Sequence, residues 1–198
     1  MIDRLMRSSV DRALKMQPRR TQKVADELLY AAPSAREDVG VIRAAGARLV
    51  DQGMCPAGLG SIAVRRSPKR AALTAIGADL SALDNRHLES VDIDDRVSPT
   101  LAALRAGAEA AVYAFPPTLL ALLAEGVELE TGVSDLADIV GEIRVVDHLD
   151  DIRSGLAVLS GRGVVSGHDD PLAAVTRLEA AEALARITVI RHSLRRNP

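Results

Sequence analysis

Two clusters of histidine and aspartate are the first candidates for chemistry in this chain of 198 residues. His148 lies in the run Asp147-His-Leu-Asp-Asp151, and His168 lies in Ser166-Gly-His-Asp-Asp170. Two imidazoles and a carboxylate can hold a divalent metal, so convergence of the two clusters would make a metal site. The aspartates have a second explanation, because Asp is a preferred N-cap and both clusters adjoin predicted helices. The sequence leaves both interpretations open.

Arg162 and Tyr113 are candidates for binding or reacting with an anion. Arg162 stands between Gly161 and Gly163, and a guanidinium holds a phosphate or carboxylate through paired hydrogen bonds. Tyr113 is the candidate catalytic residue, since a phenol can donate a proton or stabilise an anion. Each also has an ordinary structural interpretation: a solvated arginine in a glycine-rich turn, and a core tyrosine with a hydrogen-bonded hydroxyl.

Two other features do not support a site. Cys55 is the only cysteine, which excludes an internal disulfide and a zinc ribbon, and no neighbouring His or Lys would lower its pKa. The run Gly58-Leu-Gly60 follows a predicted helix and precedes a predicted strand, the reverse of the order in a dinucleotide-binding loop. We therefore expect Cys55 to be a small buried residue and the glycine run to be a connection.

The composition limits the classes of partner. Hydrophobic residues make up 47% of the chain, enough for a core, but only Tyr30, Tyr113 and Phe115 are aromatic. Few stacking platforms and a net charge of −2 argue against nucleic-acid binding. No apolar run reaches the length of a membrane span, and no secretory signal follows the N-terminal arginines. We therefore expect no nucleic-acid partner, no membrane span and a cytoplasmic location.

The elements that must position these residues follow a basic N-terminal segment. Residues 1–23 carry seven basic side chains, and apolar residues recur there at helical spacing up to Pro18. We predict that residues 1–36 form a helical extension and residues 37–198 a single domain. The extension could tether the chain to an acidic partner or membrane surface, or it could be an arm on a neighbouring subunit or a frayed end.

The rest of the sequence predicts alternating helices and strands of a layered α/β domain. Periodicity and turn residues predict helices at 34–52, 98–106, 117–123 and 171–193. They predict strands at 61–65, 70–76, 88–93, 110–115, 143–146, 156–159 and 163–165.

In this order, several segments resemble the class II aldolase/adducin family. The run 57–65, Ala-Gly-Leu-Gly-Ser-Ile-Ala-Val-Arg, is similar to a strand entry of the family, and 73–77, Leu-Thr-Ala-Ile-Gly, resembles its phosphate turn. The run 159–165 stands where members carry a His-Gly pair, and 177–183 resembles the closing helix. The resemblance covers roughly residues 37–195, with an interruption between about 125 and 155. It implies a three-layer αβα fold around a central mixed or antiparallel sheet.

The departures from the family concern its chemistry. Members hold a divalent metal with a His-X-His pair and a later histidine, and the metal acts as a Lewis acid on an enediolate oxygen. These positions align here with Tyr113, Phe115 and Arg162, which are poor or impossible ligands. The carboxylate base of the family should lie near 98–100, where the sequence is Ser-Pro-Thr. We therefore expect no metal cofactor at this position.

The resemblance also implies a pocket for a small anionic ligand, formed by Ser61, the turn at Gly77 and Arg162, and a homo-oligomeric assembly. Three functions follow. The first is a degenerate, adducin-like pseudoenzyme that acts by binding or assembly. The second is a metal-independent enzyme for a small phosphorylated or carboxylated substrate. The third is a metal-dependent aldolase whose ligands have moved to His148 and His168.

Overall fold

The computed structural model describes residues 34–95, 97–130 and 133–196, with no account of the side chains of 34–38 and 196. The chain divides into two compact units, residues 1–40 and 41–198. The predicted helical extension, 1–36, lies almost wholly outside the described residues, so it stays a prediction. The fold below is that of the second unit, into which helix α3 (Ser34–Asp51) continues from the first.

A seven-stranded mixed sheet is the centre of this unit, and its strand order is β3-β2-β1-β4-β7-β6-β5. Every neighbouring pair is antiparallel except β5 and β6, which are parallel. The prediction of an α/β fold with a mixed sheet is confirmed. The strands are β1 (Ser61–Ser67), β2 (Arg70–Thr74), β3 (Leu88–Asp92), β4 (Ala110–Ala114), β5 (Ile143–Val146), β6 (Leu156–Leu159) and β7 (Gly163–His168).

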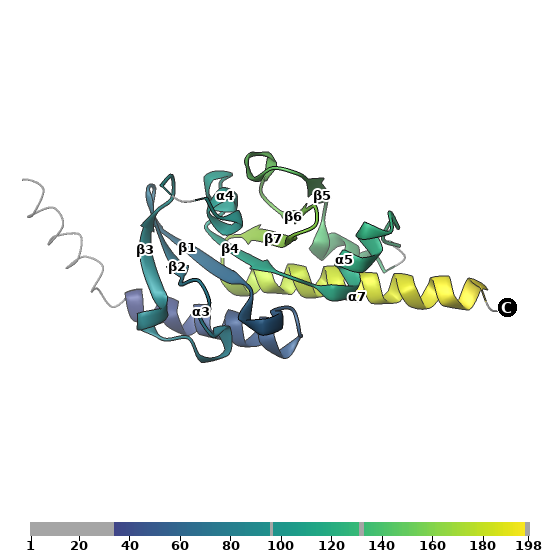
Figure 1. The fold of residues 1–198 in the computed structure, drawn as a ribbon, viewed down its shortest axis with the longest axis horizontal. Helices are drawn as coiled ribbons and strands as arrows, with labels where there is room; N and C mark the ends of the chain where they lie inside the picture. Colours follow the sequence, from purple (N-terminus) through teal and green to yellow (C-terminus); the bar gives the residue numbers. More distant parts are fainter. Residues whose placement is uncertain (1–33, 96, 131–132, 197–198) are drawn as a thin grey trace, which may run out of the picture. The chain divides into compact units, whose positions relative to one another are not determined.

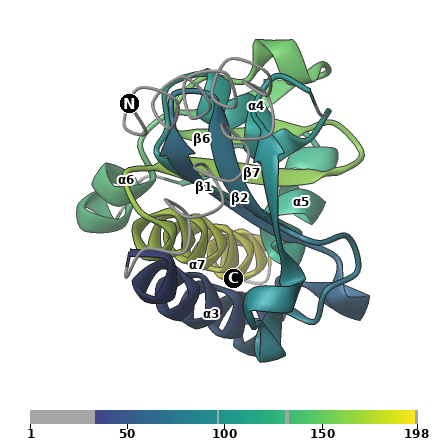
Figure 2. The ribbon, with the colours of Figure 1, turned by 90° about the vertical axis from the view of Figure 1, so that its left-hand side faces the viewer.

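Helices cover both faces of the sheet and make three layers (Figures 1 and 2). On one face, α3 and the long α7 (Pro171–Arg196) lie side by side against a core that includes Ile62, Val112 and Val164. On the other face, α4 (Pro99–Arg105) and the short 3-10 turn η4 (Leu149–Asp151) cover a second core that includes Ala63, Ala111 and Val165. Successive residues of a strand point to opposite faces, and these apolar runs therefore supply both cores.

The remaining helices are short and lie near the connections. They are α5 (Pro117–Ala124) and α6 (Ser134–Val140), with 3-10 turns η1 (Pro56–Gly58), η2 (Leu80–Ala82) and η3 (Asn85–His87). The α5 helix has a proline at its first position, where the missing N–H is not needed. Of these elements the sequence predicted α5, but not the three 3-10 turns or α6, which falls where the resemblance is interrupted.

The two long helices are joined by a polar contact between them. Arg48 of α3 forms an ion pair with Glu179 of α7, and its Nε donates to Glu179 Oε1 at 3.1 Å. Both helices are amphipathic, with apolar residues toward the sheet and charges such as these near the surface. Within the described part of the chain, no helix is long and apolar enough to cross a bilayer.

Candidate functional site

The candidate ligand-binding residues lie at one end of the sheet. Ser61 opens β1 and is the register partner of Tyr113, near the end of β4. Tyr113 in turn pairs with Val165, two residues after the start of β7. Because Ala63 pairs with Leu73, the turn at Gly77 that follows β2 lies at this same end. The register therefore brings segments far apart in the sequence to one edge, which we call the Tyr113 end of the sheet.

Ser61 and Tyr113 also share a face of the sheet. Residues two apart along a strand point to the same face of the sheet. Ser61 is therefore on the same face as Ala63, and Tyr113 is on the same face as Ala111. Ala63 and Ala111 belong to the core under α4, against which Tyr113 packs. The Ser61 hydroxyl and the Tyr113 ring are thus cross-strand neighbours on one face.

Phe115 continues the same face beyond the end of β4. Its ring meets that of Tyr113 edge to face, with centroids 5.1 Å apart and an angle of 66° between the planes. The Phe115 N–H donates to the Met54 carbonyl at 2.7 Å, which fixes the backbone after the strand. Two half-buried aromatic rings therefore lie next to each other at the Tyr113 end of the sheet.

Gly163 gives Tyr113 the space for its ring. A Cβ at Gly163 would stand 2.9 Å from the Tyr113 hydroxyl oxygen and 2.9 Å from the Ala114 carbonyl oxygen. Real Cβ atoms do not approach so closely, and so the phenol lies directly over the glycine backbone. The absence of a side chain at 163 is what allows Tyr113 to reach across β7.

Arg162 completes this group of residues from the turn between β6 and β7. Its N–H donates to the Leu159 carbonyl at 2.9 Å, while the residue as a whole is exposed. Burial raises the pKa of Tyr113 above its ordinary value of 10.0, and the charge of Arg162 acts in the opposite direction. No hydrogen bond or ion pair of the Arg162 guanidinium occurs within the described residues. Arg162 is therefore an unengaged cation close to a protonated phenol.

The residues at this end do not fit a divalent metal. The structure places Tyr113 near both Phe115 and Arg162. However, a phenol is a poor ligand without activation, and a phenyl ring and a guanidinium cannot coordinate. At the position expected for the base, Ser98 Oγ and Thr100 Oγ1 lie 2.9 Å apart and hydrogen-bond to each other.

His148 and His168 do not come together. Val146, the last residue of β5, pairs with Leu159 at the Tyr113 end, and His148 follows it by two residues. His168 ends β7 opposite Ala110, at the other end of the sheet. Among the described residues, no three His, Cys, Asp or Glu side chains form a group that could hold a metal. Asp170 instead caps α7, since its Oδ1 accepts from the Ala173 N–H at 2.9 Å.

Glu182 is a residue near this site that sequence analysis did not select. Its side chain is 2% exposed, and its two carboxylate oxygens accept from the N–H groups of Thr118 at 3.2 Å and Leu119 at 3.0 Å. These are free donors in the first turn of α5, the helix that follows Phe115. Glu182 therefore holds α5 in place beside the Tyr113 end. The sequence signal was an acidic residue within the apolar stripe of the last helix.

Cys55 lies just behind the same end and is not a nucleophile. It is buried, and burial raises the pKa of its thiol from 9.0 to about 11. The thiol is therefore protonated at neutral pH and has little nucleophilic character. Its Sγ would lie 2.8 Å from a Cβ at Gly60, so the glycine permits close packing of the strand entry over the cysteine. The expectation of a small buried residue is confirmed.

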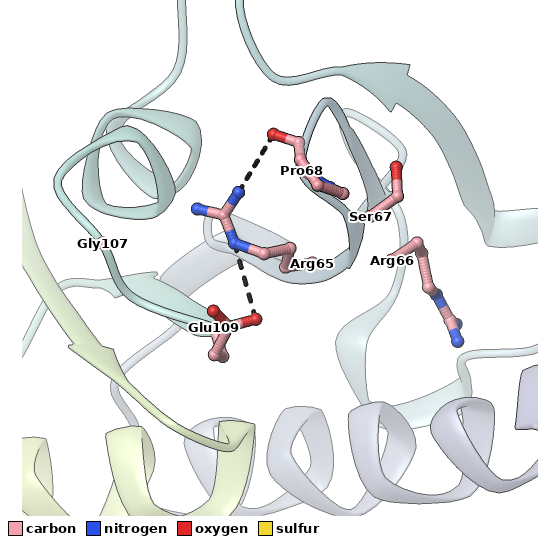
Figure 3. A pocket seen from close by; sticks show the side chains of 6 residues that line it. All are labelled: Arg65, Arg66, Ser67, Pro68, Gly107 and Glu109. Atoms are coloured by element: carbon pink, nitrogen blue, oxygen red, sulfur yellow. Dashed lines mark hydrogen bonds and ion pairs between the residues drawn. The ribbon is translucent and has the colours of Figure 1, made fainter.

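A pocket of about 470 Å³ lies at the opposite end of the sheet, but its central cation is already engaged. Arg65 donates to the carbonyls of Pro68 at 3.3 Å and Ala108 at 3.4 Å, and also to that of Leu104. Figure 3 shows Arg65 turned toward Pro68 and Glu109. Its Nε forms an ion pair with Glu109 Oε2 at 3.5 Å. The guanidinium thus fastens the end of α4 to β1 and is a structural group.

Comparisons with known proteins agree with this architecture. No known protein family matches the sequence, and no curated protein matches it either. Among solved structures, L-fuculose-1-phosphate aldolase from Thermus thermophilus is 17% identical, with a TM-score of 0.67 over 81% of this chain and 96% of that one. An aldolase II superfamily protein from Pseudomonas syringae is 15% identical, with a TM-score of 0.66 over 82% and 78% of the two chains.

A third match is a sugar-phosphate aldolase from Thermotoga maritima. It is 19% identical, with a TM-score of 0.58 over 83% of this chain and 99% of that one. Identities this low bear on the fold alone. At that level the resemblance found in the sequence is confirmed: the chain has the fold of the class II aldolases.

Proposed function

We propose that the protein is a degenerate class II aldolase-like domain that binds a small anionic ligand at the Tyr113 end of the sheet, without metal-dependent lyase activity. One observation carries the proposal. The three positions that align with the metal ligands of the family lie together, but they hold a phenol, a phenyl ring and a guanidinium. Where the family binds a metal cation, this chain has the positively charged guanidinium of Arg162, which favours an anion as the ligand.

The chemistry of the group suits a phosphate or a carboxylate. Arg162 is exposed, and among the described residues its one hydrogen bond is made by its backbone, so its planar fork is available for paired hydrogen bonds. A phenol is protonated at neutral pH, and burial raises the pKa of Tyr113 further above 10.0, so its hydroxyl can act as a hydrogen-bond donor. The hydroxyl of Ser61, its cross-strand neighbour, adds a further donor, and the turn at Gly77 lies at the same end.

The position of Tyr113 near Arg162 supports a second candidate function, a metal-independent enzyme that uses the phenol as a general acid. A protonated phenol beside a guanidinium can deliver a proton to an anion held by that guanidinium. The site then acts on a small phosphorylated or carboxylated substrate. If the protein has this function, Tyr113→Phe should lose the turnover of the substrate while it keeps its affinity for the ligand.

Assembly with further copies of the chain is the other part of the proposal. Leu59 and Ile76 adjoin Ser61 and Gly77 in sequence, and their side chains are 55% and 99% exposed. Isolated apolar side chains are common on surfaces, but two at the edge of a candidate site favour a contact there. Analytical ultracentrifugation of the Ile76→Glu variant tests this, with Val145→Glu as the control because Val145 is also an exposed apolar residue. Only Ile76→Glu should lower the mass of the oligomer. A monomeric wild-type protein contradicts it.

The test of ligand binding is a titration with inorganic phosphate and with glycolate, followed by the amide resonances of Ser61, Tyr113 and Gly163. We expect saturable shifts that Arg162→Ala abolishes and Arg162→Lys weakens, because lysine lacks the planar fork. Arg144→Ala is the matched control, since Arg144 is exposed but already paired with Glu142. Unchanged affinity in Arg162→Ala contradicts the proposal.

Elemental analysis tests the loss of the metal. The purified protein is incubated with zinc, manganese and iron salts and then dialysed. We expect no stoichiometric metal, whereas one tightly held equivalent per chain contradicts the proposal. An assay for cleavage of ketose phosphates should show no activity that depends on added metal.

A further inference from the structure

A second pocket, of about 350 Å³, lies at the end of the sheet opposite to Tyr113. Its walls come from four segments of the chain: the turn before β4, the turn before β6, the end of β7 and the second turn of α7. The lining residues are Gly107, Ala108, Ser154, Gly155, Gly167, His168, Asp169 and Arg177. This volume falls within the range of about 300–1,000 Å³ that is usual for small-molecule sites. We call it the His168 pocket.

Glycine backbone keeps the His168 pocket open. Gly107 has a φ of +104° and Gly155 a φ of +107°, which disfavour any residue with a Cβ. A Cβ built at either position meets no other atom within 4 Å, so the space above both is free. A ligand can therefore lie directly on the backbone at these two turns.

Arg177 lines this space, and part of its guanidinium is not engaged by the bonds that hold it. Its Nη1 donates to the Gly167 carbonyl at 2.7 Å and its Nε to the Ile139 carbonyl at 3.3 Å. These bonds fix the guanidinium against the pocket wall, and within the described part of the chain no acceptor meets its Nη2. A fixed guanidinium loses little entropy when it binds an oxyanion.

His168 supplies a second donor from the end of β7. Its Nδ1 accepts from the Asp169 N–H at 2.8 Å, so the neutral ring carries its proton on Nε2. Ser154 is exposed beside it, and its hydroxyl has no hydrogen bond to any described residue. The two side chains and Arg177 are three donors around one glycine-floored space.

Asp169 sets a condition on the ligand. Its neighbour Asp170 is used as the cap of α7, whereas Asp169 is exposed and lines the pocket. A group that meets Asp169 must donate a hydrogen bond, while a group that meets Arg177 must accept one. From this arrangement we infer that the His168 pocket is a second binding site, for a small molecule that carries an oxyanion group and a hydroxyl group.

The test uses two probes with one carbon skeleton, glycerol 3-phosphate and glycerate. Each is titrated into the full-length protein, followed by the amide resonances of Gly107, Gly155 and Asp169. We expect saturable shifts at these residues with at least one probe. Shifts with the phosphate alone, the carboxylate alone or both identify the oxyanion that the pocket accepts. No saturable shift with either probe overturns the inference.

Variants separate this pocket from the Tyr113 end and from effects on folding. Arg177→Gln should weaken binding at least tenfold, but Arg177 also bonds to backbone carbonyls. Ser154→Glu therefore serves as the second variant, because it places a negative charge at an exposed position of the rim. The matched control is Ser154→Gln, of the same size as the glutamate variant but without its charge, which should bind more tightly than Ser154→Glu because its amide is still a hydrogen-bond donor.

Arg162→Gln, at the other end of the sheet, should leave the shifts in the His168 pocket unchanged. Binding that survives Ser154→Glu, or that is lost in Arg162→Gln, overturns the inference. Because the two sites are read by different amide resonances, either one can fail while the other stands.

Discussion

The hydroxyl of Tyr113 lies directly over the backbone of Gly163, across the β4–β7 pair. A Cβ added at Gly163 would come within 2.9 Å of the hydroxyl oxygen and of the ring atom Cε2. The approach places the phenol beside Arg162, the residue that precedes Gly163. A glycine at the start of β7 thus decides where the phenol of Tyr113 can lie.

Gly163→Ala should therefore lower the free energy of unfolding. The new methyl group would collide with the Ala114 carbonyl oxygen, at 2.9 Å, and not only with a side chain that can rotate. Overpacking of this kind costs about 1–3 kcal/mol. Urea denaturation gives the value, and Gly40→Ala is the control, because a Cβ there meets nothing within 4 Å. Equal stability of the two variants contradicts the close approach.

Glu182→Gln should destabilise the protein more than Glu179→Gln, although both residues lie on α7. Glu182 is 2% exposed, and its two carboxylate oxygens accept from the N–H groups of Thr118 and Leu119. In the glutamine variant the side-chain NH₂ replaces one of these oxygens, so one backbone donor would face another donor. The expected loss is about 1–3 kcal/mol. Glu179 pairs with Arg48 at the surface, and its loss should cost at most about 1 kcal/mol. Chemical denaturation of both variants checks the order.

The titration of Tyr113 should respond to Arg162. Burial raises the pKa of the phenol above 10.0, and the nearby guanidinium partly offsets this, so Arg162→Gln should raise the pKa further. Tyrosinate absorbance measures it in a Tyr30→Phe background, because Tyr30 and Tyr113 are the only tyrosines. Since the folded pKa exceeds the unfolded one, this contribution to stability is complete below pH 10.0 and is lost as the pH rises further. A pKa that Arg162→Gln leaves unchanged rules out the proximity of the two groups.

Cys55 should be protected from alkylation in the folded protein. The thiol is buried, and its pKa is raised from 9.0 to about 11, so almost no thiolate exists at neutral pH. Iodoacetamide should label it slowly in buffer and rapidly in denaturant. By the same linkage, unfolding should become easier as the pH rises from 9.0 toward 11, and Cys55→Ala should remove that part of the pH dependence. Fast labelling of the native protein contradicts the burial.

Local patterns in the sequence were enough to predict most of the elements. The strand predicted at 110–115 is β4 (Ala110–Ala114), and the last helix begins at Pro171 as its Asp-Pro start predicts. These features depend on neighbours within a few residues, for which periodicity and capping are direct signals. The α6 helix was not predicted, because it lacks the proline that opens helices α4 and α5, and the residue before it, Val133, makes no side-chain cap.

The candidate sites depended on contacts that no local pattern contains. By itself, the sequence determined the layered α/β fold, the lack of metal ligands at 113, 115 and 162, and the residue types able to hold an anion. Only the tertiary structure decided that Tyr113 meets Gly163 and Arg162, that Glu182 holds α5, and that His168 lies far along the sheet from His148. The reason is physical: strand register joins residues dozens of positions apart, and a side chain's protonation and partners follow from the space and charge that this pairing creates.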